Sequence, residues 1–177
     1  MATLHVLVGL PCSGKTTRAH TREQDLPALR LTLDAWHIHL FGQDAHAPEH
    51  DARQRRSEAL LWTIARRALE LGTLVILDYG FWAREEREDY RARATHLGAR
   101  SEVHFLDVPE EELLRRLVRR NAHRSPMAFH IPEAMMKPWI AFFQNRHATN
   151  SNAEKKDEAR RWHMKGTHQA RGRHGGA

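Results

Sequence analysis

Four short hydrophobic runs divide the first 106 residues of the chain. They are Leu4–Val8, Ala28–Leu33, Thr73–Leu77 and Glu102–Leu106, and their length and composition are typical of buried strands. The stretch between each run and the next is longer and more polar, as an amphipathic helix would be. Strands that alternate with helices predict a doubly wound α/β fold around a parallel sheet.

The clearest helical pattern lies between the second and third runs. Within residues 52–71, apolar side chains recur at spacings of three and four. Pro109 and the three glutamates after it predict the start of another helix, because the helix dipole favours acidic residues there. Further helices are expected after Thr16, over residues 35–41 and 83–97, and over residues 131–145, with a kink or break at Pro138.

The sequence changes character near residue 149. Hydrophobic periodicity is lost there, and the composition of the remaining residues is typical of a flexible tail. Residues 151–177 hold seven Lys or Arg against three Asp or Glu, so they account for most of the net charge of +6. We therefore predict a folded domain over residues 1–148 and a basic tail over residues 149–177. Basicity that belongs to the tail gives little support for a nucleic-acid-binding body.

Composition narrows the class of protein. The chain has 177 residues, of which 41% are hydrophobic and 28% charged, enough for one domain with a core. It has no run of 18 apolar residues, and its first strand starts too early to leave room for a signal peptide. Cys12 is the single cysteine, which excludes an internal disulfide and fits a reducing compartment. These features predict a cytoplasmic protein that does not enter a membrane.

The most specific motif follows the first strand. Gly9–Thr16 reads Gly-Leu-Pro-Cys-Ser-Gly-Lys-Thr, a complete phosphate-binding loop in its required setting between a strand and a helix. Glycines let backbone N–H groups turn toward a polyphosphate, and the helix N-terminus adds positive potential. In such a loop the lysine neutralises phosphate charge and the threonine ligates Mg²⁺. The residues predicted to hold the nucleotide are Gly9, Pro11, Cys12, Ser13, Gly14, Lys15, Thr16 and Thr17.

Two aspartates follow strands that neighbour this loop. Asp34 comes at the carboxyl end of the second run and Asp78 at the end of the third. Ligands of open parallel sheets bind outside these strand ends, so both carboxylates are expected to face the loop. Asp34 could instead cap the helix that follows it, and Asp78 could be an ordinary turn residue.

The polar segment between Gly42 and His50 has two interpretations. Its acidic and histidine side chains could line a substrate entrance, or they could simply be solvated. The 14 histidines of the chain show no zinc-binding spacing, and His37 and His39 fall on different helix faces, so no zinc site is predicted. The segment and its neighbour contribute Asp44, His46, Glu49, His50 and Asp51.

The motifs together resemble a known group of enzymes. The loop, Asp34, the strand that ends in Asp78 and the Arg120-Asn121 segment are similar to those of small P-loop phosphotransferases of the chloramphenicol phosphotransferase, zeta-toxin and polynucleotide kinase type, which have an AAA-type ATP-binding domain. The resemblance implies the strand order 2-3-1-4 and a helical lid near residues 115–130. It also implies ATP as the phosphoryl donor, with GTP not excluded, and Mg²⁺ as the metal.

The resemblance also implies catalytic roles. Asp34 would act as the general base toward an attacking hydroxyl, together with Lys15 and Arg120 as the other catalytic residues. Asp78 would hold a Mg²⁺-bound water or the substrate, and Thr16 would ligate the metal. The lid arginines that would clamp the triphosphate are Arg116, Arg120 and Arg124. A solvated basic helix face is the alternative interpretation of these arginines.

One departure from the group concerns the acceptor. Polynucleotide kinases of this type carry an arginine three residues after the strand-2 aspartate, and here that residue is His37. A neutral imidazole holds an anion less well than a guanidinium. The sequence therefore favours a small-molecule hydroxyl, such as that of an antibiotic, over nucleic acid as the acceptor. A nucleic-acid end kinase and a nucleotide-binding regulatory module stay open. The acceptor pocket would include Asp34, His37, Asp78, Tyr79 and Phe81, with Trp36 and Trp82 as further walls.

Overall fold

The computed structural model describes residues 1–123 and 125–143. The predicted tail and Arg124 lie outside this part of the chain. None of the described helices combines the length and apolar character that a bilayer crossing needs. In chain order, the elements are β1 (Thr3–Val8), α1 (Lys15–Asp25), β2 (Ala28–Thr32), α2 (Leu33–Phe41), α3 (His50–Glu70), β3 (Leu74–Gly80), α4 (Arg84–His96), β4 (Arg100–Phe105), α5 (Glu110–Ala122) and α6 (Glu133–Phe142).

The four strands form one parallel sheet. Their order is β2-β3-β1-β4, so the strand that leads into the phosphate-binding loop lies between β3 and β4. The α/β fold class and the strand order 2-3-1-4 are therefore confirmed. β1 is buried at all six positions, as the near-continuous apolar runs of a parallel sheet require.

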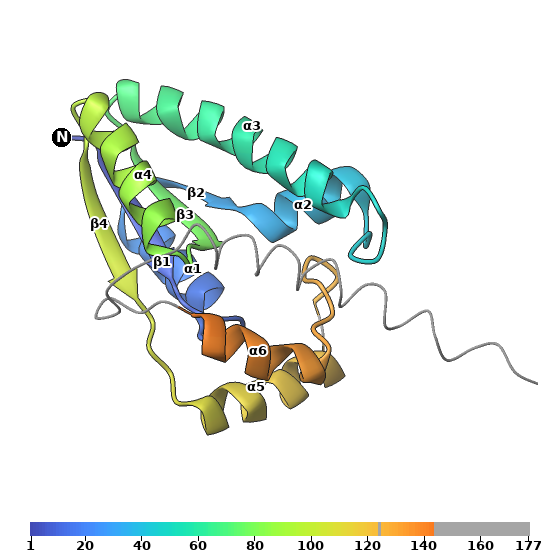
Figure 1. Ribbon diagram of the computed structural model, residues 1–177. Coiled ribbons are helices and arrows are strands. Elements are labelled where there is room, and N and C mark those ends of the chain that lie inside the picture. The colour runs from blue at the N-terminus through green and yellow to red at the C-terminus, as the bar shows by residue number, and fades with distance from the viewer. Residues whose placement is uncertain (124, 144–177) are drawn as a thin grey trace, which may run out of the picture.

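Helices cover both faces of the sheet (Figure 1). On one face, alternate residues of β1 and β3 pack against the buried stripes of α3 and α4, in a core that includes Leu4, Val6, Leu61, Leu77 and Tyr90. On the other face, Leu7 and Ile76 pack against Ala19 of α1. Because side chains alternate along a strand, the two cores share the two inner strands, β1 and β3. This arrangement fixes the start of α1 against the carboxyl end of β1.

α5 and α6 form a separate unit at the carboxyl end of the sheet (Figure 1). A second hydrophobic cluster holds them together, with Leu117 and Met136 fully buried in it. Leu10 of the phosphate-binding loop belongs to this same cluster. The loop is therefore packed between the main sheet and the α5–α6 unit, which covers it from one side.

Several element boundaries differ from those expected. α2 begins at Leu33, so Asp34 lies in the first turn of a helix rather than at the end of a strand. β3 continues to Gly80, so Asp78 and Tyr79 belong to the strand itself. α6 runs through Pro138 as one helix of ten residues. Proline removes one backbone donor, and in so short a helix the tertiary packing of Met136 and its neighbours outweighs that loss.

Candidate functional site

The phosphate-binding loop is shaped by two residues in left-handed conformations. Gly14 has a φ of 95° and Cys12 a φ of 66°. At Gly9 a different constraint applies, because an added Cβ would lie 2.5 Å from the Ser13 hydroxyl oxygen. The loop is thus folded so tightly on itself that only glycine fits at its first position. Of the predicted loop residues, Gly9 and Ser13 are buried and do not line the cavity described below. The residues that line it are Pro11, Cys12, Gly14, Lys15, Thr16 and Thr17.

Lys15 lies across the concave side of the loop. Its ammonium group donates hydrogen bonds to the carbonyl oxygens of Gly9 and Leu10, both at 2.9 Å. Burial lowers the pKa of Lys15, and the nearby Asp78 and Asp34 carboxylates oppose that effect. α1 begins at Lys15 with no side-chain cap and no acidic residue in its first turn. Helix N–H groups beside a half-buried cation make a cradle that fits a polyphosphate.

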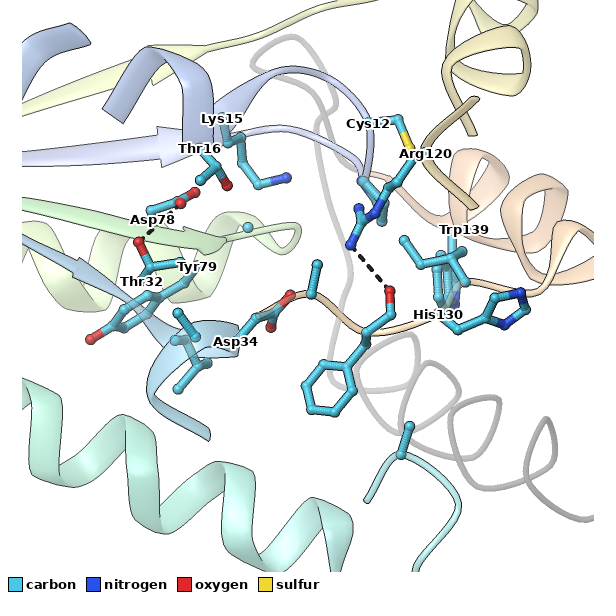
Figure 2. Close-up of a pocket in the computed structure, with 18 of the residues that line it drawn as sticks. Cys12, Lys15, Thr16, Thr32, Asp34, Asp78, Tyr79, Arg120, His130 and Trp139 are labelled. Atoms are coloured by element: carbon cyan, nitrogen blue, oxygen red, sulfur yellow. Dashed lines mark hydrogen bonds between the residues drawn. The ribbon is translucent and has the colours of Figure 1, made fainter. Parts of the chain in front are cut away.

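Asp34 and Asp78 both face this cradle from the β2–β3 side of the sheet (Figure 2). Burial raises the pKa of Asp34, the Lys15 ammonium lowers it, and the Asp78 carboxylate raises it further. Asp78 accepts a hydrogen bond of 3.2 Å from the Thr32 hydroxyl. Its carboxylate and the Thr16 hydroxyl are hard oxygen ligands of the kind that Mg²⁺ takes. The residues present therefore fit a magnesium ion between the loop and β3.

Two arginines reach the cradle from α5. Arg120 donates a hydrogen bond of 3.2 Å to the Phe129 carbonyl, and its charge acts on both Lys15 and Asp34. Arg116 donates to the Cys12 carbonyl at 3.3 Å and is also held by Glu112 at 2.6 Å. Figure 2 shows Lys15, Asp34 and Arg120 directed into the same open space. Three separate elements thus bring two cations and a carboxylate to one point.

This space belongs to a cavity of about 1670 Å³, lined by the loop, the strand ends and the α5–α6 unit. At the carboxyl end of β3, Tyr79 stacks on Phe81 with ring centroids 5.3 Å apart, and both line the cavity. Phe81 has a φ of 49°, a conformation that costs free energy in a bulky residue. Trp82 packs on Trp139 of α6. The cavity has room for a small molecule beside the phosphate-binding loop.

The structure places His37 away from this cavity, which corrects its assignment to the acceptor pocket. Its ring is 1% exposed and is bonded to the Asp44 carboxylate at 2.7 Å, which His50 also contacts at 2.8 Å. Arg53 donates to the other Asp44 oxygen at 2.9 Å. Asp44 is therefore a buried hub rather than a solvated residue, and Glu49 is exposed outside the cavity lining. Trp36 is also exposed and lines no part of the cavity.

The Asp44 hub supports the segment that carries Phe129. The Phe129 ring makes edge contacts with the rings of both His37 and His50. Gln43 donates to the carbonyls of Pro126 and Ala128 at 2.9 and 3.3 Å. Since the Phe129 carbonyl receives the hydrogen bond from Arg120, the hub helps to position that arginine over the cradle.

Replacing Asp44 with Asn is expected to destabilise the protein by about 2–3 kcal/mol, because two buried imidazoles and Arg53 lose a charged acceptor. Burial raises the pKa of Asp44, but hydrogen bonds from His50, Arg53 and His37 together lower it to about 2. A depressed carboxyl pKa gives stability that is present above the unfolded pKa and lost as the pH falls toward 2. The loss should therefore appear in urea unfolding at pH 7 and shrink in acid. Glu49→Gln, on the same segment but exposed, is the control.

Several cavity residues have no signal in the sequence. Phe129 follows α5 in a segment without periodicity, and its place depends on how that segment folds back. Glu58 and Arg55 look like residues of a solvated helix face, yet both line the cavity from α3. Glu58 accepts a hydrogen bond of 2.9 Å from the Tyr90 hydroxyl, which holds it beside Tyr79. Arg30, which bonds Thr32 and Glu23, also lines the cavity.

Comparison with known proteins places this geometry in a family. A family model described as an AAA domain matches residues 4–167 of the chain. No curated protein gives a significant sequence match. Among solved structures, a chain of the Pnkp1/Rnl/Hen1 RNA repair complex is 22% identical, with a TM-score of 0.67 over 86% of this chain and 50% of that one. The present chain thus spans about half the length of that relative.

Two other solved structures match almost end to end. Kti12 from Chaetomium thermophilum, in complex with ADP-AlF3, is 20% identical with a TM-score of 0.60, and the match covers 92% of this chain and 96% of that one. A gluconokinase from Sinorhizobium meliloti is 16% identical with a TM-score of 0.52, covering 96% and 94% of the two chains. At these identities the likeness concerns the fold alone.

Proposed function

This chain belongs to the AAA domain family and has the fold of its small P-loop kinases, and from that premise we propose that it transfers the γ-phosphoryl group of ATP to the hydroxyl of a small molecule. One observation carries the proposal. Lys15, Asp34, Asp78 and Arg120 come from four elements and act electrostatically on one another inside one cavity. That set combines a polyphosphate cradle with a carboxylate able to receive a proton.

The loop side would hold the donor. Backbone N–H groups at the start of α1 bind the phosphates, and Lys15 leaves the Gly9 and Leu10 carbonyls to neutralise β- and γ-phosphate charge. Thr16 and Asp78 would hold Mg²⁺, which would supply charge neutralisation on the phosphate oxygens. Arg120 and Arg116 stabilise the negative charge of the transition state, as members of a lid formed by the α5–α6 unit. Arg124 and GTP as an alternative donor stay predictions from the sequence.

Asp34 would be the general base. The acceptor hydroxyl donates its proton to the Asp34 carboxylate while its oxygen bonds to the γ-phosphorus. The bond between that phosphorus and the bridging β,γ-oxygen breaks, and ADP leaves. Burial favours this role, because a carboxylate with a raised pKa is a better proton acceptor. The reaction fits the cytoplasm, where we propose that it takes place.

The acceptor side supports a small organic molecule. Aromatic side chains of Tyr79, Phe81 and Trp82 supply apolar walls, and Asp51, Glu58 and Glu86 add acidic groups to the lining. Carboxylates beside aromatic walls suit a polyhydroxylated amine. We therefore propose an aminoglycoside-like antibiotic or aminocyclitol as the acceptor, which would make the chain a resistance kinase.

A polynucleotide 5′-hydroxyl kinase is the second candidate. The likeness to a chain of an RNA repair complex favours it, so nucleic acid cannot be set aside as a partner on sequence grounds. Arg30 and Arg55 line the cavity and offer cations for a phosphate chain. His37 is buried against Asp44 and offers no such group to the cavity.

The deciding experiment is a mass-spectrometric acceptor panel. The full chain is incubated with ATP and Mg²⁺ and with aminoglycosides, amphenicols, sugars or oligonucleotides that carry a free 5′-hydroxyl. Phosphorylation of a small hydroxyl compound supports the proposal, and phosphorylation of oligonucleotides alone replaces it with the second candidate. Nucleotide binding without transfer to any acceptor would favour a regulatory module instead.

The pH profile of turnover is expected to show the ionisation of Asp34. Because the base must be ionised, kcat at saturating ATP should rise with pH through an apparent pKa above the ordinary carboxyl value of about 4. This rise, the acid limb of the pH profile, should be absent from the residual activity of Asp34→Asn. A kcat that is already constant from about pH 4 upward would contradict a buried carboxylate base.

A further inference from the structure

A cluster of two histidines and one glutamate lies on β1 and β4, outside the nucleotide cavity. His5 of β1 pairs with Glu102 of β4 in the parallel register, and His104 follows two residues later on the same face of β4. His5 is 3% exposed and His104 half-buried, whereas Glu102 is exposed at the edge of the sheet. None of the three lines the nucleotide cavity. The cluster is therefore independent of the proposed reaction.

The three side chains direct one ligand atom each to a common point. His5 Nδ1 is 3.0 Å from His104 Nε2 and 3.3 Å from Glu102 Oε2, and His104 Nε2 is 3.6 Å from the same oxygen. In a tetrahedral zinc site with bonds of about 2.0–2.2 Å, ligand atoms lie about 3.3 Å apart. We propose that His5, Glu102 and His104 bind one divalent ion of the zinc class, with water completing its coordination.

The second histidine cluster provides a contrast. His37 Nε2 and His50 Nδ1 contact the same Asp44 oxygen at 2.7 and 2.8 Å, which are hydrogen-bond distances. Arg53 occupies the other Asp44 oxygen. There the protons of two imidazoles explain the geometry. At His5 and His104, two ring nitrogens face each other at 3.0 Å, a separation that either one shared proton, in a hydrogen bond, or a metal ion explains.

One feature of the surroundings opposes binding. Arg22 of α1 lies 3.4 Å from His104 Nδ1. A metal on Nε2 requires a proton on Nδ1, so Arg22 must turn away when the ion binds. Arg22 thus weakens the site and provides a test of it.

An ion held here would join the edge strand to the centre of the sheet. β4 pairs only with β1 among the described strands, and two of the three ligands come from β4. Binding in the folded state alone stabilises that state by mass action. We expect Zn²⁺ to raise the melting temperature of the full chain, without any change in nucleotide affinity.

Titration with Co²⁺ tests the site on the full chain after chelator treatment and without nucleotide. Wild type should bind one more Co²⁺ than Glu102→Gln and His104→Asn, with the visible absorption of a tetrahedral ion. Arg22→Gln should tighten this site about tenfold, because a nearby positive charge is removed. The charge-matched controls Glu88→Gln and Arg91→Gln, on the exposed face of α4, should leave it unchanged.

The histidines of residues 144–177 are present in every variant, so they cancel in the comparison. Chelator-treated melting curves of Glu102→Gln and His104→Asn show whether each variant is folded. Equal Co²⁺ stoichiometry and spectra in wild type and both ligand variants, or no Co²⁺ bound by wild type at tens of micromolar, would overturn the proposal.

Discussion

Replacing Asp34 with Asn is expected to lower kcat by about 10³-fold while nucleotide affinity stays within about twofold. Asparagine keeps the size and polarity of the side chain but cannot accept the proton of the attacking hydroxyl. The proposed nucleotide contacts come from the loop, Lys15 and the α5 arginines, none of which is changed. The measurement is single-turnover transfer to the identified acceptor, with fluorescent-nucleotide binding measured on the same preparation.

Asp51→Asn is the matched control for this variant. Asp51 also lines the cavity, but it comes from the first turn of α3 and is not among the charges that shift the pKa of Lys15 most. Its replacement should change KM for a cationic acceptor and leave kcat close to that of wild type. A large kcat loss in Asp51→Asn together with normal turnover in Asp34→Asn would mean that Asp51, rather than Asp34, is the general base.

Replacing Lys15 with Met is expected to lower kcat/KM for ATP by about 10³-fold or more, since it removes the cation from the phosphate cradle. Lys15 also lowers the pKa of Asp34. Its removal should therefore shift the acid limb of the remaining activity to higher pH, because Asp34 then holds its proton more strongly. If the role of Lys15 were only structural, its replacement would not shift the acid limb of the pH profile.

Arg18→Met, one turn further along α1, is the control for Lys15→Met. Arg18 is exposed and lines no part of the cavity, so the same change of charge and length there should leave both activity and the pH profile unchanged. Equal activity losses in the two variants would mean that net charge, rather than the position of Lys15, matters.

The sequence was sufficient for the fold because its signals are local. Leu4–Val8 followed by a glycine loop and a helix can be recognised within a few residues, and the alternation of strands and helices then predicts a parallel sheet. The ends of the elements were less predictable. Asp34 was expected to follow a strand, but Leu33 already belongs to α2, since a short polar side chain is well suited to a first helical turn.

The candidate site was only partly predictable, because much of it depends on segments meeting in space. Lys15 and Thr16 could be placed from their motif alone. The acceptor pocket could not, because His37 turns toward a loop carboxylate seven residues later, and nothing in their spacing indicates that contact. Phe129 and Glu58 reach the cavity through tertiary packing of the α5–α6 unit and α3. Such contacts have no sequence period.

The most direct measurement is a structure of the full chain with ADP, aluminium fluoride, Mg²⁺ and the acceptor found by the panel. We predict that the fluoride complex lies between Lys15 and Arg120, with the acceptor hydroxyl in line with the leaving oxygen and hydrogen-bonded to an Asp34 carboxylate oxygen. An acceptor bound with its hydroxyl away from Asp34, or an Asp34 side chain turned out of the cavity, would contradict the account.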